Sequence, residues 1–238
     1  MKIRVKFKKY GALKFIGHLD MMRYFQKALR RVEIDMKYSE GFNPHMVMSF
    51  AAPLGVGITS DGEYFDIEVL STKSSEESLR ALNEAMVEGV EVLSYVALPD
   101  NAKKSMSIVT AADYEIYFKE GYEAPKTTEE FGQIFHEFYE AQDAIVILKK
   151  TKKSEKEMDI KPLIYDFAVR EREGKPSFYL KVSTGSVDNL KPELVVSQMF
   201  EFAGLEYQKE AMQIHKFETY TENEQGFIPL DALGENIV

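Results

Sequence analysis

The sequence predicts an α+β protein made of two ferredoxin-like βαββαβ domains in tandem. Short apolar runs with a period of two residues alternate with runs of helical period. The order strand, helix, strand, strand, helix, strand occurs twice along the 238 residues. We expect a first domain over residues 1–100, a second over residues 112–222 and a peripheral tail over residues 223–238. A single α+β domain with one mixed sheet is the alternative.

The first half of the chain opens with a strand in which Ile3, Val5 and Phe7 alternate with basic residues, which predicts one apolar and one basic face. Apolar residues at helical spacing then predict a helix over residues 19–32. The elements expected next are strands over residues 33–38 and 46–51, a turn at Asp61-Gly62, a strand over residues 64–70, a helix over residues 75–87 opened by a capping box at Ser74 and Glu77, and a strand over residues 90–97.

The second half repeats this order. Thr127 and Glu130 have the spacing of a second capping box, and Pro192 suits the first turn of a helix that ends before Gly204. The remaining elements expected are a strand over residues 114–118, the end of the capped helix at Asp143, a short buried strand over residues 144–148, a hairpin of strands over residues 163–169 and 177–183, and a last strand over residues 212–220.

Composition excludes several kinds of chemistry. The chain contains no cysteine, which rules out disulfides, thiol nucleophiles and Cys-ligated iron–sulfur clusters within it. With only four histidines, we expect no metal site and no cofactor. No apolar run is long enough to span a bilayer and the N-terminus has no signal-peptide pattern, so we expect a cytoplasmic protein without a membrane partner.

Charge is distributed unevenly along the chain. Residues 1–50 hold eleven Lys or Arg and four Asp or Glu, a formal charge of +7, whereas the whole chain carries −9. The remaining residues therefore carry −16. A basic N-terminal region in an acidic protein points to an anionic partner such as nucleic acid.

The first helix carries a candidate phosphate-binding stripe. Arg23, Lys27, Arg30 and Arg31 lie at positions i, i+4, i+7 and i+8, opposite the apolar face. We expect the basic face of the first strand, with Lys2, Lys6 and Lys8, to extend this stripe into one positive patch that contacts RNA phosphates. A solvated helix face is the alternative. A second basic run over residues 149–156 could extend the track.

Two histidines belong to the candidate site. His18 lies at the start of the first helix, two residues before Asp20, where it could act as general acid or base on RNA. Its alternative role is to cap the helix or to bond a buried carbonyl. His45 ends the loop that begins at Tyr38, and the rings of Tyr38, Phe42 and His45 could stack on bases.

The same loop also has a structural interpretation. Gly41 permits backbone conformations closed to other residues, and Asn43-Pro44 favours a turn. A tight turn that places Phe42 in the core is therefore as plausible as a base-stacking loop.

Several ordered motifs resemble the radical-SAM-associated family, a bacterial family found fused to, or encoded beside, B12-type radical SAM proteins. The resemblance covers nearly the whole chain and is densest over residues 13–70. Its motifs are Phe15-x-Gly17-His18-Leu19-Asp20, Ala28-Leu29-Arg30-Arg31, the segment from Tyr38 through Asn43 to His45, Ser49-Phe50-Ala51-x-Pro53-Leu54-x-x-Gly57 and Glu63-Tyr64-x-Asp66-Ile67-Glu68. The resemblance implies a radical SAM protein as partner.

Three functions follow as hypotheses. The first is a non-catalytic accessory protein of a radical SAM enzyme that binds RNA through its basic N-terminal domain. The second is a metal-independent RNA-processing endoribonuclease that uses His18. The third is a protein–protein adaptor that does not contact RNA.

Overall fold

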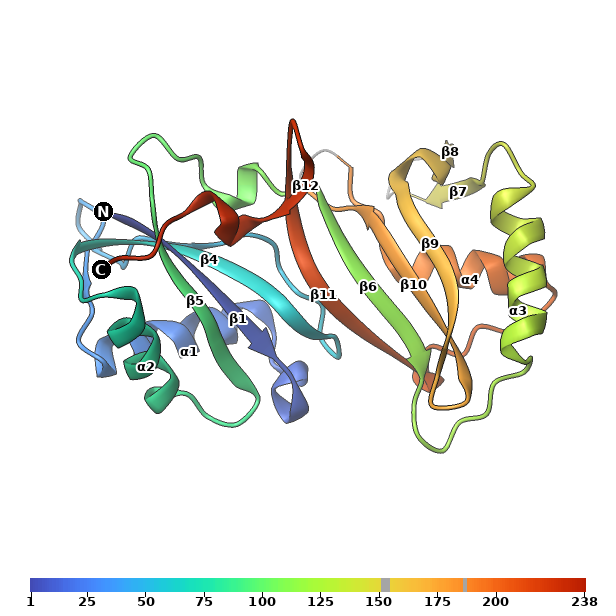
Figure 1. The fold of residues 1–238 in the computed structure, drawn as a ribbon, viewed down its shortest axis with the longest axis horizontal. Helices are drawn as coiled ribbons and strands as arrows, with labels where there is room; N and C mark the ends of the chain where they lie inside the picture. Colours follow the sequence, from blue (N-terminus) through green and yellow to red (C-terminus); the bar gives the residue numbers. More distant parts are fainter. Residues whose placement is uncertain (151–154, 186–187) are drawn as a thin grey trace. The chain divides into compact units, whose positions relative to one another are not determined.

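The computed structural model describes residues 1–150, 155–185 and 188–238 (Figure 1). The chain divides into two compact units, unit 1 with Met1–Ala111 and Lys216–Val238, and unit 2 with Ala112–His215. The last twenty-three residues thus belong to unit 1, whereas the sequence placed residues up to 222 in the second domain and the rest in a peripheral tail. The difference arises because one strand supplies residues to both units, which a periodic pattern does not reveal.

Unit 1 holds two helices, α1 and α2, against a sheet (Figure 1). Its helices begin within two residues of the positions that the sequence predicts. Its elements are β1 (Lys2–Lys9), the 3-10 helix η1 (Gly11–Phe15), α1 (His18–Arg31), β2 (Asp35–Met36), β3 (Met48–Phe50), β4 (Thr59–Ser71), α2 (Ser75–Ala85), β5 (Val90–Leu98), η2 (Ser105–Ser107), the later part of β11 (Met212–Asn223), β12 (Gly226–Pro229) and η6 (Leu230–Leu233).

The strands of unit 1 follow the spatial order β5-β1-β4, and both pairings are antiparallel. β2 and β3 pair with the second half of β4, where Met36 lies opposite Val69 and Phe50 opposite Phe65. Ser74 caps α2 by accepting a hydrogen bond from the Glu77 backbone N–H, which confirms the predicted start of that helix.

One face of this sheet packs against the helices and forms the core. Ile3, Val5 and Phe7 of β1 are almost fully buried against the apolar face of α1. The ring of Phe7 lies 4.7 Å from the ring of Phe25, edge to face. The alternation in β1 therefore places its apolar side chains as the sequence predicts.

The predicted turn at Asp61-Gly62 is wrong, because both residues lie inside β4. A Cβ atom on Gly62 would come within 2.7 Å of the Glu218 Cα atom and of the Phe217 carbonyl oxygen in β11. Glycine is needed here for close backbone approach between strands. Glycine next to aspartate occurs more often in turns, and the sequence alone does not distinguish a turn from a close approach between strands.

The C-terminal segment is integrated into unit 1 rather than peripheral to it. β12 pairs with β11, and Ala97 exchanges backbone hydrogen bonds of 2.9 Å with Glu235. Leu230 is completely buried. The Ser75 backbone N–H donates to the carbonyl of Ile237 at 2.9 Å, so the segment is held almost to its end.

Unit 2 also combines helices with a sheet, and the predicted mixture of helices and strands is confirmed for both units. Thr127 and Glu130 form a complete capping box, as predicted. The elements are β6 (Ala111–Phe118), α3 (Thr128–Phe135) continued by the π-helix η3 (His136–Glu140), β7 (Val146–Lys150), β8 (Glu155–Asp159), η4 (Lys161–Leu163), β9 (Ile164–Arg172), β10 (Lys175–Ser183), α4 (Pro192–Phe202), η5 (Lys209–Ala211) and the first residues of β11.

The strands of unit 2 follow the order β11-β6-β10-β9, with β10 and β9 antiparallel. The predicted short strand over residues 144–148 corresponds to β7, which pairs with β8 in a separate two-stranded sheet. In residues 1–150, 155–185 and 188–238, no helix is long and apolar enough to cross a membrane.

Candidate nucleic-acid interface

The basic residues of α1 are exposed on the side opposite its buried face, and one of them also contacts α2. Tyr24 and Arg31 turn toward α2, since Arg31 donates to the Ala85 carbonyl at 3.2 Å and the Tyr24 hydroxyl accepts from the Val87 N–H at 2.9 Å. Adjacent residues on a helix point about 100° apart. Arg23 and Arg30 therefore lie about 100° around the helix from Tyr24 and Arg31, opposite the buried Phe25 and Ala28. We call this solvent-facing side, together with Lys27 beside it, the outer flank.

The strands β2 and β3 share the core that lies under α1, since Met36 and Phe50 pack in one cluster with Phe25. α2 packs on β5, at one end of the order β5-β1-β4, whereas β2 and β3 lie on the other side of β4. The outer flank of α1 faces away from this core. Leu19 lies one turn before Arg23 and belongs to the same flank.

Two of the flank cations have no carboxylate partner. Arg23 pairs with Asp20 at 3.1 Å, and both side chains are about two-thirds exposed. Lys27 and Arg30 are exposed and form neither an ion pair nor a side-chain hydrogen bond within the part of the chain that the structure describes. Their charge is available to an anion from outside.

A loop projects from the edge of the sheet that β2 and β3 form. β2 and β3 follow one line along β4, because the Lys37 N–H donates to the Glu68 carbonyl and the Glu68 N–H donates to the Val47 carbonyl. Residues 38–46 form an excursion from that line, which we call the finger. The Val47 N–H donates to the Lys37 carbonyl at 2.9 Å and closes its base.

The finger is held by its own hydrogen bonds. The Ser39 N–H donates to the His45 carbonyl at 2.8 Å, and the Ser39 hydroxyl contacts both the His45 N–H at 3.1 Å and the His45 Nδ1 at 2.8 Å. Gly41 has a φ of 113°, which allows the chain to reverse near the tip. At its base, the Glu68 carboxylate accepts from Lys37 at 2.8 Å, and this bond raises the pKa of Lys37 and lowers that of Glu68.

Ring side chains on the finger face solvent. Phe42 is fully exposed and Tyr38 is 43% exposed, whereas Met46 is the finger residue that packs into the core. The alternative in which Phe42 fills the core is therefore wrong. His45 and Asn43 are also exposed, so the structure brings the predicted loop residues together on one projection.

His18 is half-buried at the first position of α1. Its ring lies edge to face on the ring of Phe50, with centroids 5.2 Å apart. Within the described residues, no hydrogen bond or ion pair involves its ring nitrogens, so neither a capping role nor a hydrogen-bonded general acid–base pair is seen. His18 thus packs between α1 and β3.

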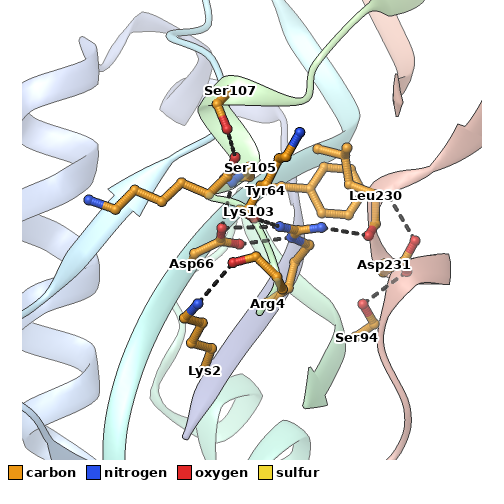
Figure 2. A network of polar contacts seen from close by, with 12 residues as sticks. Lys2, Arg4, Tyr64, Asp66, Ser94, Lys103, Ser105, Ser107, Leu230 and Asp231 are labelled. Carbon is orange, nitrogen blue, oxygen red and sulfur yellow. Dashed lines mark hydrogen bonds and ion pairs between the residues drawn. The ribbon is translucent and has the colours of Figure 1, made fainter. Parts of the chain in front are cut away.

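The basic face of β1 does not extend the α1 stripe, and that prediction is wrong. Lys2, Arg4 and Lys6 alternate with the core residues and so point away from α1. Figure 2 shows Arg4 among acceptors from other segments. Its guanidinium donates to both oxygens of Asp66 at 2.8 and 3.1 Å and to the Leu230 carbonyl at 2.9 Å, while Asp66 accepts from the Ser105 N–H at 2.7 Å.

The neighbours of Arg4 on β1 are engaged in the same way. Lys2 donates to the carbonyls of Asp100 and Ala102, and Lys6 pairs with Glu218. Arg4 is completely buried, and Lys6 is largely buried. These side chains donate to internal acceptors and hold the segments that cover this face of the sheet, and Arg4 and Lys6 are also neutralised by carboxylates.

A second buried polar group lies next to this network. The Tyr64 hydroxyl lies 2.8 Å from Glu218. It also lies 3.0 Å from Asp231, which accepts from the Ser94 hydroxyl at 3.0 Å (Figure 2). Burial, together with the two carboxylate charges, raises the pKa of Tyr64 far above its usual value. The hydroxyl is therefore locked in its neutral form and ties the C-terminal segment to the sheet.

Another buried cation positions the start of α1. Lys9 donates to the Ile16 carbonyl at 2.6 Å, just before the helix. Burial lowers the pKa of Lys9, and the nearby charge of Glu63 opposes that shift. Glu63 itself pairs with the buried Lys216.

Exposed apolar residues next to α1 were missed by the sequence interpretation. Phe15, Leu19 and Val56 are each at least 60% exposed. The Gly57 N–H donates to the Lys14 carbonyl at 2.8 Å, which brings Val56 near Phe15. The helical spacing groups Leu19 with the buried apolar residues of the helix, so it does not reveal this exposure, and loop residues such as Val56 carry no period.

Two further predictions concern metal and the second basic run. Among the described residues, no three histidine or acidic side chains are grouped so that they could hold a metal ion. Within the run over residues 149–156, residues 151–154 lie outside the described residues, and no side chain in the run is described.

Comparison with known proteins yields one family match. The family described as "Uncharacterized protein conserved in bacteria (DUF2344)" matches residues 2–192. This confirms a bacterial family, and its description does not mention radical SAM proteins. None of the curated proteins compared with the chain matches it.

Among solved structures, a chain of "Crystal Structure of a Cbf5-Nop10-Gar1 Complex" is similar with a TM-score of 0.48 and 11% identity over 93% of this chain. This chain spans 50% of that one. An unknown protein from Galdieria sulphuraria is similar with a TM-score of 0.25 and 12% identity, over 92% of this chain and 97% of that one. Both likenesses are too distant to bear on function.

Proposed function

We propose that this chain, which belongs to the DUF2344 family of bacterial proteins, binds RNA through the outer flank of α1 and the finger, as a non-catalytic partner of a radical SAM enzyme. The observation that carries the proposal is the pair of exposed cations Lys27 and Arg30, which have no carboxylate partner in the described chain. Most of the other N-terminal charge is engaged internally.

Electrostatics favours a polyanion over a protein surface. Each phosphate that a lysine or arginine neutralises releases counterions and gives salt-dependent affinity. Arg23 can join Lys27 and Arg30 once a phosphate competes with Asp20, because exposed ion pairs contribute only about 0–1 kcal/mol. Unit 1 can thus bind RNA although the chain as a whole is acidic.

The radical SAM partnership rests on the motifs and on composition. Radical SAM chemistry needs a cysteine-ligated cluster, and these 238 residues contain no cysteine. The cluster would have to lie outside this sequence. The chain would then present RNA to the partner enzyme in the cytoplasm.

The proposal includes a tandem ferredoxin-like architecture. In unit 1 the order β5-β1-β4, with β2 and β3 beyond β4, corresponds to the fourth, first, third and second strands of a βαββαβ unit. In unit 2 the order β11-β6-β10-β9 corresponds in the same way, with the β7–β8 hairpin inserted. Function still rests on the α1 surface, since folds of this kind serve many activities.

Binding of bulk tRNA to the full chain tests the proposal. Changing Lys27 and Arg30 together to Glu should weaken binding by about tenfold or more. The matched control changes Lys73 and Arg80, two exposed cations near and on α2, to Glu, which alters the net charge equally and should leave affinity within about twofold. Equal loss in both variants, or no salt-dependent binding by the unmodified chain, would overturn the proposal in favour of a protein adaptor.

The endoribonuclease alternative is tested with His18. Changing His18 to Ala should leave tRNA affinity unchanged, because its ring packs on Phe50. Cleavage of tRNA by the unmodified chain, lost in that variant, would replace the accessory role by catalysis.

A further inference from the structure

We propose that the finger is a base-stacking element, so that the RNA bound by unit 1 is single-stranded where it meets Phe42. This inference rests on the proposed function and names the class of RNA. It starts from Phe42, which is fully exposed, and from Tyr38, which is 43% exposed.

The exposure of Phe42 has no role in folding the finger. Met46 anchors the finger in the core with 3% of its surface exposed. The base is closed by the bridge between Tyr38 and Met46 and by the Ser39–His45 hydrogen bonds. Removal of the Phe42 ring therefore leaves every described contact of the finger intact.

The finger is closed by hydrogen bonds within the chain itself. A side chain on a pre-formed loop loses less conformational entropy on binding than one on a mobile loop. Phe42 also has only two rotatable bonds in its side chain, and its ring presents two open faces. Such a ring can stack on any base, whatever the sequence.

Charge around the finger favours a nucleic acid over an apolar protein segment. The basic helix α1 shares one core with the base of the finger, where Met46 packs. Lys37 at the base is taken by Glu68, and Glu40 is an acidic residue on the finger itself. The phosphates would thus lie along α1, with bases turned toward Phe42.

The assignment of phosphates to α1 and of bases to Phe42 predicts whether single-stranded or duplex RNA binds more tightly. In a duplex the faces of the bases are covered by their neighbours, so a ring on a loop reaches them only where the strand is unpaired. The α1 cations accept phosphates from either kind of RNA. We therefore expect single-stranded RNA to bind more tightly than a duplex of the same sequence.

The test measures affinity for a mixed-sequence RNA oligonucleotide, its duplex and the single-stranded DNA of the same sequence. Phe42→Ala should weaken binding of the single strand by about 5- to 150-fold and leave duplex binding unchanged, since the loss of one stacking interaction has that effect. Phe42→Tyr should retain affinity. Phe15→Ala, which removes an exposed ring off the finger, should have no effect.

Each outcome decides between the two proposals. Equal binding of duplex and single strand, or an unchanged affinity of Phe42→Ala, would overturn stacking but leave phosphate binding by α1 in place, and Phe42 would then serve a protein contact. Equal binding of the DNA strand would keep stacking and overturn RNA as the ligand. If the unmodified chain binds none of the three, both proposals fall.

Discussion

The basic residues of β1 and those of α1 come from neighbouring stretches of sequence but serve different ends. Arg4 is completely buried and donates to Asp66 and Leu230, whereas Lys27 and Arg30 are exposed and have no carboxylate partner in the described chain. A charge of +7 over residues 1–50 is therefore partly structural. The part open to a ligand lies on one flank of one helix.

The difference follows from periodicity. β1 has apolar residues on one side, so Lys2, Arg4 and Lys6 point to the other, where the C-terminal segment and residues 99–105 supply acceptors. α1 has a wider polar surface, and Tyr24 and Arg31 at its border contact the end of α2 and the residues after it. A count of charges along the sequence cannot distinguish these cases, because it ignores what each face of an element contacts.

The largest effect is expected from removing a buried cation of β1. Arg4→Ala should lower the free energy of unfolding by about 3–5 kcal/mol, because Asp66 would be left as an uncompensated charge. Arg23→Ala, which removes the exposed pair with Asp20, should cost about 0–1 kcal/mol. Urea unfolding of the full chain measures both values. Equal losses would show that the two sets of cations are not different in kind.

The next prediction concerns the segment that covers the β1 face. Leu230→Ala should cost about 2–5 kcal/mol, since the side chain is completely buried. Leu233→Ala is the matched control, because Leu233 is 39% exposed and should cost less than about 1 kcal/mol. Thermal unfolding compares the stability of the two variants. Equal stability would indicate that the C-terminal segment is a peripheral tail.

Alkaline pH should lower the stability of the folded chain through Tyr64, which lies on the sheet face that the C-terminal segment covers. Its pKa in the folded chain is raised by burial and by Glu218 and Asp231, while the unfolded chain has a value of about 10. Stability is thus full below that pH and falls above it by about 1.4 kcal/mol per pH unit, because only the unfolded chain releases the proton. Tyr64→Phe should reduce this slope in unfolding curves measured above pH 10.

Tyr38→Phe provides the comparison for that slope, since Tyr38 is an exposed finger residue. It should leave the dependence on alkaline pH unchanged. An unchanged slope in Tyr64→Phe would mean that the Tyr64 hydroxyl is not held between the two carboxylates.

The smallest effect is expected at the base of the finger. The bond from Lys37 lowers the pKa of Glu68, so the stabilisation by this pair is present above the unfolded-state value of about 4.3 and is lost as the pH falls through the lower folded value. Glu68→Gln should cost less than about 1 kcal/mol at neutral pH and flatten the acid limb of the unfolding profile. Glu84→Gln, an exposed residue of α2, should do neither.

Much of the fold is encoded in local patterns. The starts of α2 and α3 follow from caps at Ser74 and Thr127, and β1 follows from strict alternation. Pairing between distant segments is not encoded locally. Gly62 has the composition of a turn, but it serves the approach of β11 from more than 150 residues away.

The candidate site was predictable in residue type but not in arrangement. The sequence identified the α1 cations and the residues of the finger. It wrongly predicted that the basic face of β1 extends the α1 cations into one patch, and it left Phe42 either in the core or in solvent. That choice depends on whether Met46 or Phe42 fills the space beneath the loop, which is decided by packing. His18 lies against Phe50 for a similar reason, since β3 is placed by its pairing with β4.

Phosphate binding should depend on α1 and not on β1. The salt dependence of RNA affinity tests this for three proteins: the unmodified chain, Lys27→Gln/Arg30→Gln and the β1 variant Lys2→Gln. We expect the α1 variant to lower the slope of log affinity against log salt by about 0.7 for each phosphate that it no longer neutralises, and the Lys2 variant to keep the original slope. An unchanged slope in the α1 variant, or an equal decrease in the Lys2 variant, would show that α1 is not the phosphate-binding element.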